Sequence, residues 1–405
     1  MTQRAILFTG LVRDPVRFNA LLDTIVDCRR HFELPIIVST WRDELAKYPE
    51  ILARLKGLGV HIVEQNPPNL VLSGHILHQI ACIDLGLDVL DDKCFVLKLR
   101  PDISNSADIT DFLATAPIAA PRTRAMPSPF QEKLHIRAFF AAHPFYINDI
   151  TIAGSAGDMR LLCRLPFLTP LRYSRLGPEQ LLWAPPFIQD IPVLDAYLRA
   201  NVGLIFNNPD QFALLRNVLL GEPIFARAIA CSMIAMQENF AFLGADPLQP
   251  TSEAVARGMT LEDMLWAPSD LPHFASHPTC YTNGIRTIGL VDAIITGAYA
   301  PSPFGEAVAA AISRYSRPGA ITEQKAAKAS LHAEAARLAA RVEQEVGIIG
   351  MKAVHDAPAH RQTQGAQGNW SIVNPGDRTA ALDVEINMLR RTIDGLNQRL
   401  RAAGV

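Results

Sequence analysis

The chain has 405 residues, enough to bury a full core and to form more than one domain. Its 38 basic and 40 acidic residues nearly cancel, which excludes the broad positive field that recruits nucleic acid or an anionic membrane surface. No stretch approaches the roughly 18 apolar residues that span a bilayer. Six scattered cysteines without paired spacing predict buried thiols in a reducing cytoplasm, not disulfides or a zinc site.

The first hundred residues alternate between strand and helix signals. Apolar runs predict strands at 5–9, 35–39, 60–64 and 95–99, and helical spacing predicts helices at 15–30, 43–58 and 74–89. This order favours an α/β fold with a mostly parallel sheet and helices on both faces. No G-x-G-x-x-G motif follows the first strand and no P-loop is present, which disfavours dinucleotide binding of the oxidoreductase type.

The pattern loosens after about position 108 into proline-rich connections, and helical spacing returns at 211–242 and 305–346. A composition shift at Gly347 begins a predicted flexible linker, 347–378, whose later part has almost no apolar content. An amphipathic helix is predicted at 379–405 because apolar residues recur there at heptad spacing. Two interpretations of that helix stay open: it joins two copies of the chain, or it folds back onto its own domain.

The predicted strand 95–99 ends in an unusual group of charges. Because side chains alternate along a strand, Lys98 and Arg100 point to the same face, and Asp102 follows after a proline. In open α/β sheets, ligands bind outside the carboxyl ends of the strands. Two cations and one carboxylate at this edge therefore predict a site for an anionic ligand. An ion pair between Arg100 and Asp102, or a turn at Asp102, is the structural alternative.

Short segments on both sides of this strand resemble the WavE family of lipopolysaccharide-synthesis proteins. The matching segments, all within residues 5–187, are 6–10, 36–41, the helix around Gln79, 96–102, the region of Asp149 to Asp158, and 178–180. The resemblance implies a GT-A-like, Rossmann-like catalytic domain at 1–245. It also implies that the chain is a glycosyltransferase, which moves a sugar from a nucleotide-diphosphate donor to a hydroxyl group of a bacterial surface glycan such as lipopolysaccharide. The resemblance does not cover the residues that follow, where recurring prolines and helix signals predict a helical C-terminal extension that starts with an accessory region at 246–346.

Metal-dependent enzymes of the GT-A type hold the donor phosphates through an Asp-x-Asp pair. The corresponding triplet here is Arg100-Pro101-Asp102, so a cation replaces the first carboxylate. Asp102 could still bind a divalent cation, Mn²⁺ or Mg²⁺, together with water and phosphate oxygens. Arg100 offers a bidentate fork to a phosphate. Whether a metal ion is used stays open.

Two further carboxylates are candidate catalytic residues. Asp149 lies within an apolar run, where a charge is costly unless it is paired or bound, so we expect it to bind the metal or the acceptor. A turn at Asn148-Asp149 is the alternative. Glu179 is expected to be the catalytic base, as the resemblance implies, although Pro178-Glu179 is also an ordinary first turn of a helix. Asp158 is expected to cap the helix that follows it.

The nucleotide is expected to lie over the ends of the first strands and the helix around Gln79. The predicted nucleotide-binding residues are Thr9, Gly10, Arg13, Thr40, Gln79, Lys98 and Arg100. The expected partners are a nucleotide-sugar donor and a glycan or lipid-linked glycan acceptor. Because the first aspartate of the pair is missing, a second function stays open: a catalytically silent GT-A-like module that binds a glycan or nucleotide and assembles a biosynthetic complex.

Overall fold

The computed structural model describes residues 3–69, 75–164, 176–200, 209–244, 258–266, 285–286 and 288–356. The chain divides into two compact units, Met1–Met351 and Lys352–Val405. Of the second unit, only the end of a long helix is described, so the predicted heptad helix at 379–405 lies outside the described residues. Within the described part of the chain, no helix is long and apolar enough to cross a membrane.

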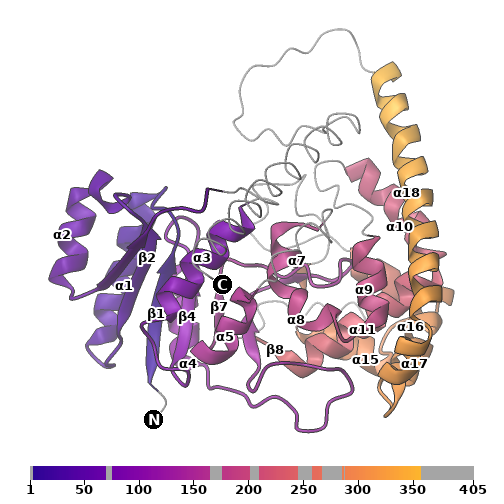
Figure 1. The fold of residues 1–405 in the computed structure, drawn as a ribbon, viewed down its shortest axis with the longest axis horizontal. Coiled ribbons are helices and arrows are strands. Elements are labelled where there is room, and N and C mark those ends of the chain that lie inside the picture. Colours follow the sequence, from indigo (N-terminus) through magenta and orange to yellow (C-terminus); the bar gives the residue numbers. More distant parts are fainter. Residues whose placement is uncertain are drawn as a thin grey trace, which may run out of the picture. The chain divides into compact units, whose positions relative to one another are not determined.

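The first unit contains a seven-stranded sheet. Its strands, in spatial order, are β3 (His61–Gln65), β2 (Ile36–Trp41), β1 (Arg4–Thr9), β4 (Phe95–Leu99), β7 (Ile152–Ser155), β5 (Leu134–Ile136) and β8 (Phe240–Phe242). All these strands run parallel to one another except β7, which pairs antiparallel with both β4 and β5. Strands β1, β2 and β4 of this sheet are labelled at the left of Figure 1. The predicted α/β class with a mostly parallel sheet is confirmed. A separate two-stranded sheet joins β6 (Phe139–Phe140) to β9 (Ile285–Arg286).

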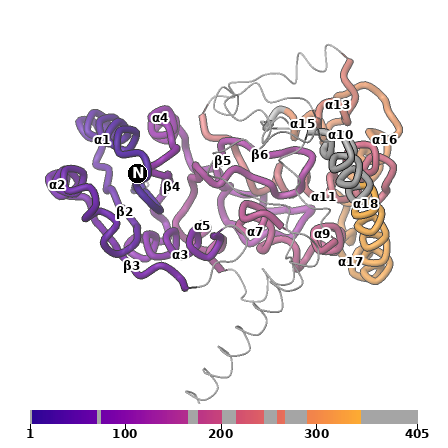
Figure 2. Tube along the Cα trace, turned by 90° about the horizontal axis from the view of Figure 1, so that it is seen from above, coloured from indigo at the N-terminus to yellow at the C-terminus, as the bar shows by residue number. Residues whose placement is uncertain are grey.

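Helices cover both faces of the sheet (Figure 2). The helices of the first part are α1 (Pro15–Arg29), α2 (Pro49–Gly57), α3 (Ile76–Leu87), α4 (Ser106–Ala114) and α5 (Ala156–Cys163). Alternation along β1 divides the core: Ile6 and Phe8 pack in one cluster with α1, α2 and α4, whereas Ala5 and Leu7 pack in the other with α3 and α5. The strands are apolar on both sides because both sides are covered.

Three of the predicted helices are divided. The helix predicted at 43–58 is a short 3₁₀ turn, Leu45–Lys47, followed by α2, because Pro49 lacks the N–H that would continue the first turn and Asp43 has a left-handed φ of 65°. The helix predicted at 211–242 is divided at Pro223 into α10 (Pro209–Leu220) and α11 (Pro223–Asn239), and its last residues form β8. The helix predicted at 305–346 forms α16 (Pro303–Tyr315), α17 (Ala320–Ala326) and the first part of α18 (Lys328–Asp356), with Pro318 between α16 and α17.

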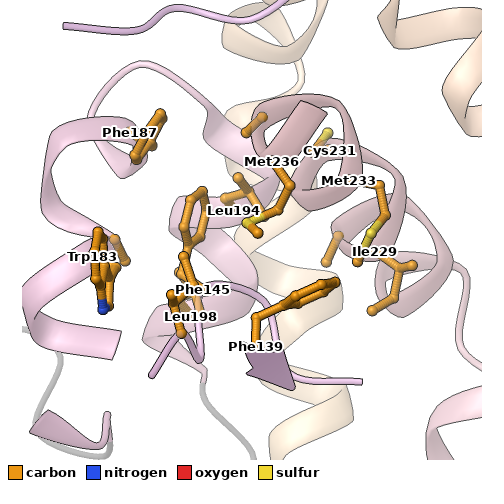
Figure 3. Close-up of a cluster of buried hydrophobic side chains, with 14 of the residues drawn as sticks. Phe139, Phe145, Trp183, Phe187, Leu194, Leu198, Ile229, Cys231, Met233 and Met236 are labelled. Atoms are coloured by element: carbon orange, nitrogen blue, oxygen red, sulfur yellow. The ribbon is translucent and has the colours of Figure 1, made fainter. Parts of the chain in front are cut away.

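The remaining helices are α7 (Pro178–Trp183), α8 (Pro185–Ile188), α9 (Pro192–Arg199), α13 (Leu261–Trp266), α15 (Ile288–Thr296), α16 (Pro303–Tyr315), α17 (Ala320–Ala326) and α18 (Lys328–Asp356). Of these helices, α9, α15 and α16 pack directly on α11. Figure 3 shows Ile229, Met233 and Met236 of α11 among aromatic and aliphatic side chains from α7, α8, α9 and β6. One continuous cluster includes side chains from β1 to α18, so the predicted boundary at 245 does not separate two cores.

The first residues of the predicted linker are helical. α18 continues to Asp356, so residues 347–356 of the predicted linker are helical. Its earlier part packs on the core through Leu331, Ala335, Leu338 and Val342, which recur at helical spacing. The rest of the predicted linker lies outside the described residues.

Candidate functional site

The carboxyl ends of β1 and β4 lie where the strand order reverses. The chain places β2 and β3 on one side of β1 and β4 on the other. In open α/β sheets such a switch point is where ligands bind. Phe8 pairs with Leu99, so the loops that follow the two strands start side by side. Arg17 of α1, which was not predicted, ties them together by donating to the carbonyl of Ile103 (3.1 Å).

Asp102 lies between two arginines in this position. Its Oδ1 accepts from Nε of Arg100 (3.2 Å) and its Oδ2 from Nη2 of the same guanidinium (3.1 Å). Nη1 of Arg13 lies 3.7 Å from Oδ2. The side chain of Asp102 is 9% exposed, that of Arg100 27% and that of Arg13 65%. The ion pair that the sequence left as an alternative is therefore formed, and two cations remain partly open to solvent.

A tight turn holds Arg100 in place. Its N–H donates to Oγ of Ser104 (2.8 Å), and the N–H of Ser104 returns a bond to the carbonyl of Arg100 (3.2 Å). Burial by itself would lower the pKa of the guanidinium, but the charges of Asp149, Asp102 and Glu179 outweigh it and raise the pKa. Arg100 is thus the shared cation of three carboxylates.

Lys98, the second residue before Arg100, is buried. Its ammonium donates to the main-chain carbonyl of Asp149. Burial lowers the pKa of Lys98 to about 8, against the opposing pull of Asp149 and Asp102. The structure therefore places the Lys98 ammonium against the Asp149 loop, where it orients the backbone, and not at the exposed edge where a nucleotide would contact it.

Asp149 reaches the site because β7 runs antiparallel to β4. Lys98 pairs with Ile152, so the residues just before Ile152 lie beyond the carboxyl end of β4. Asn148 forms the turn that the sequence left as an alternative, because its side-chain oxygen accepts from the N–H of Ile150 (2.7 Å). Nε2 of Gln79 donates to Oδ2 of Asp149, and Asp149 is buried. Gln79 and Asp149, which were predicted for different roles, are hydrogen-bonded partners.

Glu179 lies in the first turn of α7, after Pro178 at the N1 position. The residue is half-buried, since part of its surface reaches solvent, but its carboxyl group is surrounded by protein atoms. This burial, together with the charge of Asp149, raises the pKa of Glu179 to about 7. Hydrogen bonds from its own main-chain N–H and from Tyr146, and the charge of Arg100, oppose the shift. At neutral pH the group is therefore able both to hold and to accept a proton.

A strained turn carries Tyr146 to Glu179. Phe145 is buried with a left-handed φ of 58°, a conformation that a large residue adopts only when its surroundings impose it. Nε2 of Gln180 donates to the carbonyl of Pro144 (2.8 Å), which fastens α7 to this turn. The stacking of Phe145 on Phe187 of α8 fixes the turn further. No sequence signal indicated this turn, since Phe is an uncommon residue at positive φ.

The loop after β1 is held by one residue of β2 and one residue that follows it. Gly10 has a φ of 99°, and a Cβ there would meet nothing within 4 Å, so its backbone angle and not a lack of space requires glycine. Thr40 is buried and donates to the carbonyl of Gly10 (2.8 Å), and Thr9 is also buried. Glu44, which was not predicted, accepts from the N–H of Val12 (3.2 Å). Thr40 and Glu44 therefore shape the loop that presents Arg13.

The expected role of Asp158 as a helix cap is wrong. Ser155, not Asp158, caps α5: its hydroxyl accepts from the N–H of Asp158 (3.1 Å). Asp158 instead accepts from the N–H groups of Gln131 (2.9 Å) and Glu132 (2.8 Å). The sequence missed this because a Ser and an Asp three residues apart are both plausible caps.

The described residues do not fit a divalent cation at Asp102. Both of its oxygens are directed at guanidinium groups, which repel a cation. Among the described residues, no group of three His, Cys, Asp or Glu side chains could hold a metal ion. The charge that a metal would supply to phosphates is present here as Arg13 and Arg100.

Comparisons with protein-family models, with curated proteins and with solved structures returned no match. The resemblance of residues 5–187 to the WavE family therefore stays a prediction from short segments.

Proposed function

We propose that this chain is a glycosyltransferase that moves a sugar from a nucleotide-diphosphate donor to a hydroxyl group, with a bacterial surface glycan such as lipopolysaccharide as the acceptor class. The observation that carries the proposal is the combination at one switch point of two accessible guanidiniums with a carboxyl group whose pKa is about 7. The first part suits a diphosphate, and the second suits removal of a proton from a hydroxyl group.

Arg13 and Arg100 supply the phosphate contacts. A diphosphate leaving group gains negative charge as the glycosidic bond breaks, so fixed cations beside it lower the barrier. Arg100 lies in a tight turn at the end of β4, which limits the reorganisation needed when that charge develops. The loop after β1, with Gly10 and Arg13, supplies the second contact.

Glu179 acts as the base. The acceptor oxygen forms a bond to the anomeric carbon, the bond from that carbon to the diphosphate oxygen breaks, and the diphosphate keeps its electron pair. The acceptor proton passes to the Glu179 carboxylate. A base is most effective when its pKa is close to the working pH, which burial and Asp149 achieve for Glu179. Asp149, bound to Gln79 and Lys98, positions the site and tunes Glu179.

The α/β fold with a mostly parallel sheet is compatible with the GT-A-like interpretation and supports it at the level of fold class. The first four strands form a parallel sheet with helices on both faces, and the single antiparallel strand β7 brings residues of the second half to the switch point. The segments that resemble the WavE family include β1, β2, β4 and the start of α7.

The second candidate is a catalytically silent module that binds a nucleotide or glycan. The ion pair between Arg100 and Asp102 favours it, because the residue expected to bind a metal is neutralised. The two candidates differ in turnover, not in binding.

A panel of nucleotide sugars separates them. The purified full chain is incubated with UDP-, GDP- and dTDP-linked sugars, with and without glycan acceptors, and released nucleoside diphosphate is measured. A transferase releases one nucleoside diphosphate, faster when acceptor is present. Binding by calorimetry without release from any donor would support the silent module instead.

A further inference from the structure

Asp102 is already saturated by cations of the protein. Its two oxygens accept from two nitrogens of Arg100 at 3.1 and 3.2 Å, which is a bidentate pair, and Arg13 lies 3.7 Å from one of them. A carboxylate that ligates Mg²⁺ or Mn²⁺ must direct an oxygen at the ion, and the two guanidiniums occupy that side of Asp102. Asp102 therefore acts as a counter-ion for the arginines.

The arginines can exchange this counter-ion. A guanidinium fork binds phosphate oxygens with the same geometry as carboxylate oxygens, and a phosphate group carries more charge. Both guanidiniums are partly exposed, Arg13 at 65% and Arg100 at 27%, so an anion can reach them from solvent. The buried ammonium of Lys98, two residues before Arg100 in the chain, adds to the positive potential at the site.

We infer that the switch point is an anion-exchange site: a diphosphate displaces Asp102 from Arg100 and Arg13 and binds without a divalent cation. The identification of the diphosphate as that of a nucleotide sugar rests on the proposed function, but the exchange itself does not. Asp102 in this account keeps the two arginines paired and oriented in the free protein, and it competes with the ligand.

The direction in which one substitution changes the affinity for pyrophosphate tests this inference. Binding of inorganic pyrophosphate to the full chain is measured by calorimetry in EDTA. If Asp102 competes with the anion, Asp102→Asn removes the competing charge and binding becomes about threefold to tenfold tighter. A metal-ligand role predicts the opposite: wild-type binding needs Mn²⁺ and Asp102→Asn weakens it. Either of these results overturns the inference.

Asp92→Asn is the matched control. Asp92 pairs with Arg160 and precedes β4, so it lies toward the opposite edge of the sheet, and the substitution makes the same change in charge. Pyrophosphate affinity should stay within about twofold of the wild type. An equal gain in Asp92→Asn and Asp102→Asn would assign the effect to net charge and overturn the local exchange.

Arg13→Gln is a second test variant, and it leaves the ion pair between Arg100 and Asp102 in place. Because Arg13 is largely exposed, its loss should leave the fold intact and weaken pyrophosphate binding about tenfold, with a shallower dependence on salt. Unchanged binding would contradict the inference. The two proposals fail separately: pyrophosphate binding in EDTA without sugar transfer refutes only the transferase, and transfer that requires Mn²⁺ refutes only the exchange.

Discussion

Glu179 illustrates how a neighbouring charge and burial act on one residue. Its pKa is raised from the usual 4.5 to about 7, so the folded protein keeps the proton between these values while the unfolded chain loses it. Stability is therefore fully present below pH 4.5 and falls as the pH rises through 7, because the folded state binds the additional proton.

Glu179→Gln should remove this pH dependence. The variant and the wild type should melt at similar temperatures at pH 4, where both side chains are neutral, and the variant should melt higher at pH 8. Glu50→Gln is the control, since Glu50 follows Pro49 in the first turn of α2 but is exposed. A difference between the Glu179 variant and the wild type that stays constant from pH 4 to pH 8 would contradict the assignment.

The sequence predicted several residues of this site but not how they combine. Lys98, Arg100 and Asp102 could be placed because an apolar run that ends in charges identifies the end of a buried strand. The bond between Gln79 and Asp149 could not, because it depends on β7 running antiparallel to β4, a long-range pairing. The contact of Tyr146 with Glu179 depends on a left-handed Phe145, which no local propensity favours.

At the scale of elements, the predicted bounds of a strand or helix agree with the structure where the residues at its ends differ clearly in polarity from those inside it. The predicted strand 95–99 coincides with β4 because its neighbours are polar and its residues are apolar. The predicted helix 43–58 failed at Pro49, whose stop signal competed with a good helical period. Residues on both sides of the boundary predicted at 245 belong to one hydrophobic cluster, and loosened periodicity in the sequence does not reveal which helices share a core.

The packing of α3 on β1 and β2 is close enough to be tested by one methyl group. A Cβ on Gly86 would overlap Cδ1 of Leu7 and lie 3.1 Å from Cβ of Ser39. Because α3 carries Gln79, Gly86→Ala should displace the helix and lower the free energy of unfolding by about 1–3 kcal/mol. Urea unfolding measures this loss.

Gly57→Ala is the control for this prediction. Gly57 is also helical, at the end of α2, and a Cβ there meets nothing within 4 Å. This variant should be neutral or more stable by up to about 1 kcal/mol, because alanine is the better helix former. Equal effects of the two substitutions would show that the space around Gly86 does not matter.

At the scale of the whole molecule, α18 belongs to the first unit from Lys328 to Met351. Asp195 of α9 is buried and pairs with Arg199 (2.6 Å), with Lys328 (3.5 Å) and with His332 (3.4 Å), the last two from α18. Leu331, Leu338 and Val342 of the same helix are buried. The helix therefore contributes both a charge network and apolar area.

Two truncations test this contribution. A chain that ends at residue 356 should keep the unfolding free energy of the full chain, because the described core contacts of α18 come from earlier residues. A chain that ends at residue 327 should lose roughly 5 kcal/mol or more, at about 1.5–3 kcal/mol for each large aliphatic side chain. Equal loss in both truncations would show that residues after 356 hold the fold.

The transferase proposal depends most directly on Glu179, and one paired measurement tests it. Donor binding by calorimetry and sugar transfer by product analysis are measured for the wild type and for Glu179→Gln with the donor that the panel identifies. We predict transfer by the wild type and, in the variant, nearly unchanged donor binding with transfer reduced about a hundredfold to ten-thousandfold, since a base acts in the transition state. Undiminished transfer in the variant, or no transfer by a wild type that binds the donor, would contradict the account.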